Sequence, residues 1–151
     1  CISNAMNVGH PSNLARVIDL YGGHMDETGK ILSPPDLKRM RQEMFAVSIN
    51  DDETRKTIKN TYAKYKIILE PHGAVAWAGL IRYFKTGVKP ELAISIETAH
   101  PAKFPEEITK ILGVDPIRPP SLADLDNKKE NYLSIENDYN QFKKFLLDKF
   151  V

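Results

Sequence analysis

The 151-residue sequence has little of what marks several common protein classes. Its single cysteine, Cys1, leaves no second thiol for an internal disulfide and offers no metal-ligand spacing. Lysine and arginine total 21 against 20 acidic residues, and a net charge of +1 gives little long-range attraction for phosphate backbones or anionic lipid. No apolar run approaches the ~18 residues of a membrane-spanning helix, and no signal segment opens the chain. These absences predict a cytoplasmic protein with no nucleic-acid or membrane partner.

Common site motifs are missing as well. No GxGxxG or GxxxxGK string occurs, so a nucleotide loop is not supported, and there is no nucleophile elbow. The histidines lack the i, i+4 spacing of a helical zinc pair, and no nearby cysteine or paired acid completes a site. The sequence therefore predicts no metal site at any of its four histidines, which are His10, His24, His72 and His100.

The sequence opens at Cys1 without an initiator methionine. Ser3-Asn4-Ala5-Met6 has the form of a tag-cleavage scar, but Cys1 and Ile2 precede it, and a scar normally forms the terminus. The favoured interpretation is a native sequence that begins within a longer protein.

Helix signals recur along the chain. Asn50 followed by three acidic residues supplies a cap and a first turn suited to the positive end of a helix. Pro71 is well placed as the first residue of the next helix, and Gly113 ends another that begins near Pro105. Apolar spacing predicts further helices within residues 14–21, 35–41 and 139–146.

Two segments have the pattern of strands. Phe45–Ile49 alternates apolar and small or polar residues, and Leu92–Ile96 is an almost continuous apolar run, typical of a strand buried on both faces. Helices alternating with short strands predict an α/β fold. Two strands make a marginal sheet, so the pattern indicates part of a larger α/β domain that is rich in helices.

A polar turn follows the second predicted strand. Ligands of open α/β sheets bind beyond the carboxyl ends of strands, and Thr98 lies there with a hydroxyl that can donate or accept a hydrogen bond. The residues alone favour structural roles. Thr98 would satisfy a loop or helix-end amide, His100 would bond to backbone, and Lys103 would lie solvated at the surface.

Four strings then stand out together. They are SNAMNVGHPSN (Ser3–Asn13), DDETRKTI (Asp51–Ile58), EPHGAVAWAGL (Glu70–Leu80) and ETAHPAKF (Glu97–Phe104). In this order and spacing the chain resembles the bacterial and fungal branch of threonine synthase. The resemblance implies the C-terminal segment of the catalytic domain of a fold-type II pyridoxal-phosphate enzyme. Residues 1–113 would be the family-matching part, 114–131 a connection and 132–151 a terminal helix.

The resemblance also implies an activity and site residues. The family uses pyridoxal 5'-phosphate to convert O-phospho-L-homoserine and water to L-threonine and phosphate. The threonine of its TAHPAKF string looks like the group that hydrogen-bonds the pyridine nitrogen, which assigns cofactor binding to Thr98 and overrides the structural interpretation. His72, His100 and Lys103 match family strings and are candidates for the substrate pocket.

The resemblance is incomplete in one respect. The family's Schiff-base lysine lies in an upstream string ending in Phe-Lys-Asp, and a loop rich in asparagine and glycine holds the cofactor phosphate; neither string is in this chain. Lys85 and Lys103 do not fit the lysine string. No catalytic residue is therefore predicted here. The expected anchor lies in the N-terminal part of the same enzyme, and the isolated chain should be inactive.

Two hypotheses of other classes stay open. The chain could be a non-catalytic module that binds a partner through an exposed sheet edge, since such edges recruit strands. It could also be a small α/β module that binds an anionic ligand through Thr98, His100 and Lys103.

Overall fold

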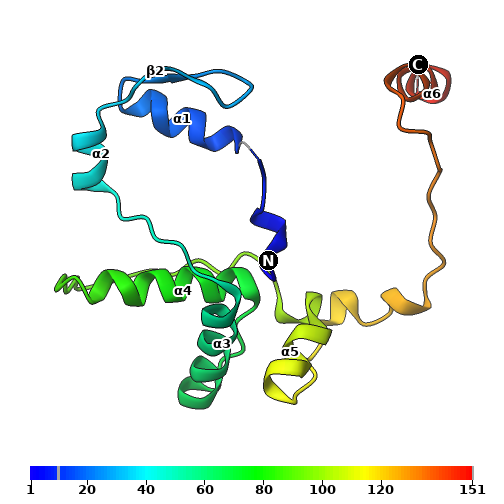
Figure 1. Cartoon of the computed structure of the whole chain (residues 1–151). Helices are drawn as coiled ribbons and strands as arrows, with labels where there is room; N and C mark the ends of the chain where they lie inside the picture. Colours follow the sequence, from blue (N-terminus) through cyan, green and yellow to red (C-terminus); the bar gives the residue numbers. More distant parts are fainter. Residues whose placement is uncertain (10, 151) are drawn as a thin grey trace. The chain divides into compact units, whose positions relative to one another are not determined.

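The computed structural model describes residues 1–9 and 11–150 (Figure 1). Two compact units are present, Cys1–Ile117 and Arg118–Val151. Helices dominate, and the sheet found in the described residues has two short strands. This confirms the expected helix-rich α/β class with few short strands. No helix in the described part of the chain is both long enough and apolar enough to cross a membrane.

The first unit begins with a small helix-hairpin-helix region. Its elements are the 3-10 helix η1 (Asn4–Met6), α1 (Ser12–Leu20), β1 (His24–Met25), β2 (Ile31–Ser33) and α2 (Leu37–Glu43). The strands are antiparallel, and Asp26 closes their turn because its Oδ1 accepts the backbone N–H groups of Thr28 and Lys30, each at 2.9 Å. Ile18 of α1 is buried against this hairpin with Met25.

Three further helices and a 3-10 turn complete the first unit. They are α3 (Asp51–Tyr65), α4 (Pro71–Phe84), η2 (Pro101–Lys103) and α5 (Pro105–Leu112). The predicted end signals are confirmed. Asn50 accepts the N–H of Glu53 at 2.9 Å, Pro71 is the first residue of α4, and Gly113 ends α5 in the left-handed conformation at φ 68°.

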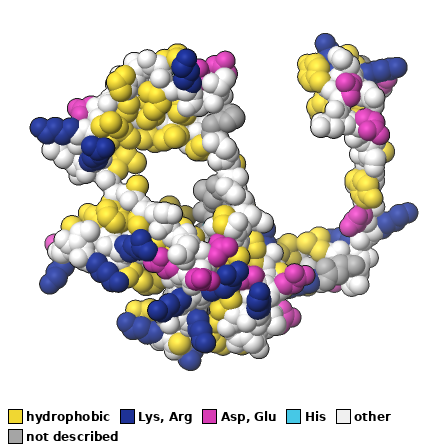
Figure 2. Space-filling view, in the orientation of Figure 1, with side chains coloured by type: hydrophobic (Ala, Val, Ile, Leu, Met, Phe, Trp, Pro, Cys, Tyr) yellow, Lys and Arg dark blue, Asp and Glu magenta, His cyan; other side chains and the backbone are white. Residues whose placement is uncertain are grey.

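The core of this unit joins α3, α4 and α5. Ile58, Ala74 and Ile108 come from these three helices, and each has no exposed surface. Phe104, just before α5, packs on the same cluster. The core is small, and many apolar side chains remain at the surface. Figure 2 shows hydrophobic side chains over α1 and the hairpin and along α4.

The second unit contains two 3-10 turns and one helix. They are η3 (Pro120–Leu122), η4 (Leu125–Asn127) and α6 (Tyr139–Phe150), and α6 confirms the predicted terminal helix. None of the described side chains of α6 is buried, and Phe142 is 48% exposed.

The two strands predicted from sequence are wrong. Phe45–Ile49 and Leu92–Ile96 are both irregular, and neither pairs with another described segment. Alternate residues of the second segment, Leu92, Ile94 and Ile96, are 78%, 77% and 69% exposed. A strand is fixed by hydrogen bonds to a neighbouring strand, which the described residues do not supply. The apolar pattern indicates a segment whose side chains need a partner surface, but it does not identify that partner.

Candidate functional site

Two of the strings singled out above meet around a buried glutamate at the start of α4. Glu70 has no exposed surface and caps this helix. Its Oε1 accepts the N–H of Gly73 at 2.7 Å, and its Oε2 accepts the N–H of His72 at 2.8 Å. A carboxylate suits this place because the first turn of a helix has unpaired N–H groups and a positive dipole end. Pro71 follows as the first helical residue, where its missing N–H costs nothing.

His72 is held by the same carboxylate. Its Nδ1 lies 2.6 Å from Oε2 of Glu70, and an ionised carboxylate can only accept, so Nδ1 carries the proton of this pair. The Phe104 ring lies against the imidazole, with centroids 5.4 Å apart. The other ring nitrogen, Nε2, is buried and has no hydrogen-bond partner among the described residues. An unpaired buried polar atom costs about 1–3 kcal/mol, which a partner from outside these residues would remove.

Glu97 brings the second string onto the helix start. Its Oε1 accepts the backbone N–H of Glu70 at 2.7 Å, a contact between residues 27 positions apart. Burial raises the pKa of the Glu97 carboxyl; the hydrogen bond from the Glu70 N–H opposes this rise, the charge of Glu70 adds to it by a smaller amount, and His100 opposes it least. Two carboxyl groups therefore share the first turn of α4.

The candidate residues lie on this same stretch. Thr98 directly follows Glu97, is exposed, and makes no hydrogen bond with the described residues through its hydroxyl. His100 is exposed, and its Nδ1 accepts the N–H of Ala102 at 3.1 Å, so it caps η2. Lys103 is exposed at the end of η2. The structure thus gathers the segments that carry all four candidates, and their functional roles stay predictions.

Sequence reasoning missed the two glutamates that join these segments. Glu70 had a usable signal, because an acidic residue directly before a proline at a helix start is typical of an N-cap. Glu97 had none, because its contact with Glu70 spans 27 residues and leaves no local pattern.

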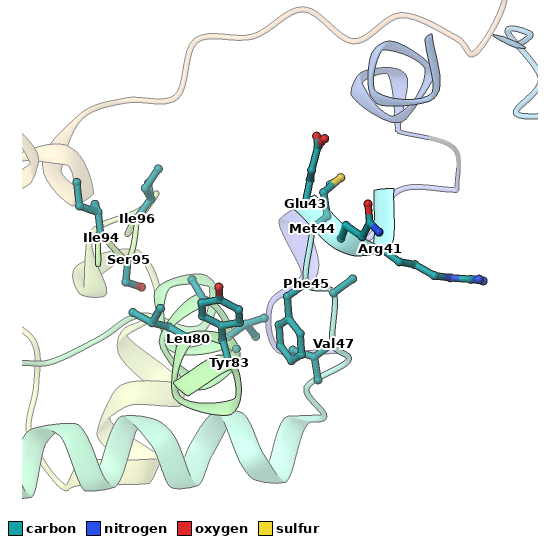
Figure 3. Close-up of a pocket in the computed structure, with 15 residues that line it drawn as sticks. Arg41, Glu43, Met44, Phe45, Val47, Leu80, Tyr83, Ile94, Ser95 and Ile96 are labelled. Atoms are coloured by element: carbon teal, nitrogen blue, oxygen red, sulfur yellow. The ribbon is translucent and has the colours of Figure 1, made fainter. Parts of the chain in front are cut away.

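A groove of about 710 Å³ lies on another part of α4 (Figure 3). Its lining is mostly apolar and comes from α4 between Val75 and Tyr83, from residues 41–47 and from residues 94–96. The Phe45 ring packs against Tyr83, with centroids 5.5 Å apart. None of the candidate residues lines this groove, so it is distinct from the cluster at the helix start.

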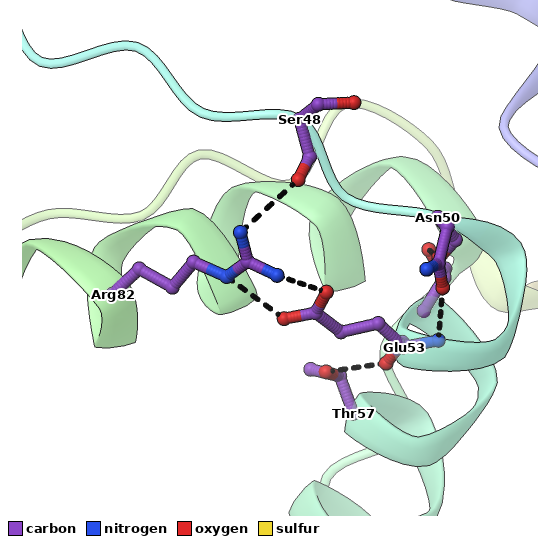
Figure 4. Close-up of polar contacts among 6 residues, drawn as sticks. Ser48, Asn50, Glu53, Thr57 and Arg82 are labelled. Carbon is purple, nitrogen blue, oxygen red and sulfur yellow. Dashed lines mark hydrogen bonds and ion pairs between the residues drawn. The ribbon is translucent and has the colours of Figure 1, made fainter.

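Arg82 fixes the chain that borders this groove. Its Nε donates to Oε1 of Glu53 at 3.0 Å, and its Nη1 donates to the carbonyl oxygen of Ser48 at 3.3 Å (Figure 4). These bonds tie α4 to the first turn of α3 and to the residues just after Val47. As for metals, no group of three histidine, cysteine or acidic side chains in the described part of the chain is placed to hold an ion. His10 lies outside the described residues.

Comparisons with known proteins agree with the strings that meet here. The family described as "Threonine synthase, C-terminal" matches residues 73–146. The threonine synthases of Buchnera aphidicola subsp. Schizaphis graminum and Haemophilus influenzae are each 32% identical to this chain, over 98% and 97% of it. The chain belongs to the threonine synthase family. This confirms the family indicated by the sequence.

A solved threonine synthase has the same local fold. The crystal structure of PLP-bound threonine synthase from Brucella melitensis matches with a TM-score of 0.61 and 27% identity, over 80% of this chain and 25% of that chain. The chain spans about 30% of the length of the Buchnera and Haemophilus threonine synthases. The likeness is therefore to a segment of a threonine synthase, and the family profile places that segment at the C-terminal end.

Proposed function

We propose that this chain is the C-terminal segment of a cytoplasmic threonine synthase that converts O-phospho-L-homoserine and water to L-threonine and phosphate. The observation that carries the proposal is the match to threonine synthases over almost the whole chain. Because the chain spans about 30% of those relatives, the reaction is assigned to the full-length protein, and the chain alone is expected to be inactive.

The residues of the candidate site fit one side of a pyridoxal-phosphate pocket. The Thr98 hydroxyl is exposed and uses none of its hydrogen-bonding capacity on the described residues, so it is free to donate to the pyridine nitrogen. A neutral hydroxyl leaves that nitrogen largely unprotonated. When bound, the cofactor acts as the electron sink for proton loss at the amino-acid substrate. His72, His100 and Lys103 would line the substrate side of the same pocket.

The rest of the enzyme is the proposed partner of the exposed apolar segment. Leu92, Ile94 and Ile96 present three large side chains to solvent, and the apolar groove over α4 opens beside Ile94 and Ile96. Exposed apolar surface of this kind marks interaction sites. We propose that the N-terminal part of the enzyme packs on residues 92–96 and covers these three side chains.

The alternative of an autonomous anion-binding module has less support. His100 already uses Nδ1 to cap η2, and the adjacent Glu97 and Glu70 bring two carboxyl groups to the same place. The match to threonine synthases over almost the whole chain favours a cofactor site over an autonomous anion site. We therefore retain the cofactor role of Thr98 and not a free phosphate site.

The absence of a cofactor anchor is testable on this chain. We expect incubation with pyridoxal phosphate, borohydride reduction and peptide mapping to label no single lysine above the surface background. Most lysines here are ordinary exposed side chains, including Lys103, and none lies in the family's anchor string. Selective labelling of Lys85 or Lys103 would contradict the proposal and would make this chain an enzyme in its own right.

Replacing Thr98 tests the pyridine contact. In the full-length enzyme, Thr98→Val keeps the side-chain shape but removes the hydroxyl. We expect kcat to fall about fivefold, because a hydrogen bond is worth about 1 kcal/mol and 1.36 kcal/mol is a factor of ten in rate. Thr98→Ser keeps the hydroxyl and should retain most of the turnover. Steady-state kinetics measure kcat of both variants. Unchanged turnover in Thr98→Val would contradict the assignment of Thr98 as the contact of the pyridine nitrogen.

A further inference from the structure

Glu97, the residue before Thr98, is fixed to the start of α4 by two separate contacts. Its Oε1 accepts the backbone N–H of Glu70 at 2.7 Å. Its side chain also lies so close to Gly73 that a Cβ at position 73 would be 2.8 Å from Cγ and 3.1 Å from Cδ of Glu97. A carbon side chain therefore does not fit at position 73 while Glu97 keeps its place.

The helix start that receives Glu97 is itself held by the Glu70 carboxylate. Glu70 is buried, and its two carboxylate oxygens accept hydrogen bonds from His72 and Gly73. The raised pKa of Glu97, which burial causes, agrees with a carboxyl group held against this helix start. Glu97 and Thr98 are both exposed residues, but the Thr98 hydroxyl makes no hydrogen bond with the described residues, although Thr98 directly follows a side chain that is held at two points.

We propose that Glu97 and Gly73 are positioning residues that hold the chain against α4, so that Thr98 presents its hydroxyl to the pyridine nitrogen of the cofactor. This inference rests on the proposed function, because it takes Thr98 as the cofactor contact. Neither Glu97 nor Gly73 touches the cofactor. Gly73 provides the space, Glu97 provides the hydrogen bond, and Thr98 makes the contact.

The two glycines of α4 give a matched pair of variants. An added Cβ at Gly73 collides with Glu97, whereas one at Gly79 would meet Val47 at 3.6 Å, an ordinary van der Waals distance. Both changes replace glycine with alanine on the same helix, Gly73 in its first turn and Gly79 in its interior. In the full-length enzyme, Gly73→Ala should lower kcat by up to about fivefold, the loss expected for Thr98→Val. Gly79→Ala is the control for an added methyl group on α4, and it should lower the affinity for pyridoxal phosphate less than Gly73→Ala does.

The carboxylate contact is tested without any steric change. Glu97→Gln keeps an oxygen that can accept the N–H of Glu70 and should retain most of the turnover. Glu97→Ala removes the acceptor and should lower kcat as Gly73→Ala does. In the Thr98→Val background, Glu97→Ala should cause no further loss, because a residue that acts through Thr98 has nothing left to position. Adding Gly73→Ala to Glu97→Ala should cost little more, because the Cγ and Cδ atoms that it would displace are gone and only the Cβ of residue 97, at 3.2 Å, remains close.

Two readouts separate positioning from general destabilisation. The dissociation constant for pyridoxal phosphate should rise, and the absorption band of the bound cofactor should shift in the same direction, in Thr98→Val, Glu97→Ala and Gly73→Ala. The thermal midpoints of the three variants should not change in parallel with these two quantities. If Gly73→Ala fails to fold, the comparison of Glu97→Ala with Glu97→Gln still decides the question.

The outcomes distinguish this inference from the function on which it rests. A wild-type enzyme that forms no threonine, or a Thr98→Val variant with full turnover, overturns the proposed function and the positioning role together. A Thr98-dependent enzyme in which Glu97→Ala keeps wild-type kcat, affinity and absorption overturns the positioning role alone. The positioning role would also be overturned if the double variant Glu97→Ala, Thr98→Val lost kcat by the product of the two single losses, because the two residues would then act independently.

Discussion

Replacing Glu70 with alanine should lower the free energy of unfolding of this chain by about 3–5 kcal/mol, because each buried hydrogen-bond donor left without a partner costs about 1–3 kcal/mol. Glu70 has no exposed surface, and its carboxylate accepts the N–H groups of His72 and Gly73 and the Nδ1 proton of His72. Alanine would leave these three donors buried without a partner. Urea denaturation followed by circular dichroism in the helix band measures the loss.

An exposed helix cap of the same chain is the control. Asn50 caps α3 by accepting the N–H of Glu53, and it lies at the surface, so Asn50→Ala should cost only about 1 kcal/mol. Glu70→Gln should fall between the two, because it keeps one acceptor oxygen but turns an amide NH₂ towards other donors. If Glu70→Ala costs no more than Asn50→Ala, the buried cluster contributes nothing beyond an ordinary cap.

Truncation of either isoleucine in the core should have an effect of similar size. Ile58→Ala and Ile108→Ala each should lower the free energy of unfolding by about 2–5 kcal/mol, the range for large-to-small changes in a packed interior. Both side chains are completely buried and meet Ala74 where α3, α4 and α5 join. In so small a core, neighbouring side chains have little room to fill the space that is left. The same denaturation experiment measures the effect.

A surface isoleucine serves as the matched control. Ile117 is 89% exposed, so Ile117→Ala should change stability by no more than about 0.5 kcal/mol. A core variant as stable as Ile117→Ala would mean that α3, α4 and α5 are not held together by this cluster in solution.

Local signals in the sequence predicted the helices well. Asn50, Pro71 and Gly113 each act within one turn of their own helix, so the residue type alone indicates the boundary. The strand predictions were wrong because strand pairing is not a local property. The pattern of Leu92–Ile96 predicts an extended apolar segment, but pairing needs a second segment that no residue within the pattern specifies. The short hairpin β1–β2 was missed because two or three residues hold too little alternation to be recognised.

The candidate site was predictable only as separate strings. Motif resemblance pointed to His72, Thr98, His100 and Lys103, and it placed them on two segments of the chain. It did not reveal that a carboxylate of one segment accepts a hydrogen bond from the backbone of the other, as Glu97 does from the N–H of Glu70. Contacts of that kind depend on the tertiary fold, so the bonding that holds Thr98 beside α4 emerged from the structure.

The exposed face of Leu92, Ile94 and Ile96 also has a consequence for biosynthesis. In an enzyme whose N-terminal part precedes this segment, these residues leave the ribosome after that complementary part has been made. Their exposure is then brief, and the apolar face finds its covering within the same polypeptide. The same segment made without that part would keep its hydrophobic surface open, and such surfaces drive aggregation at micromolar concentrations.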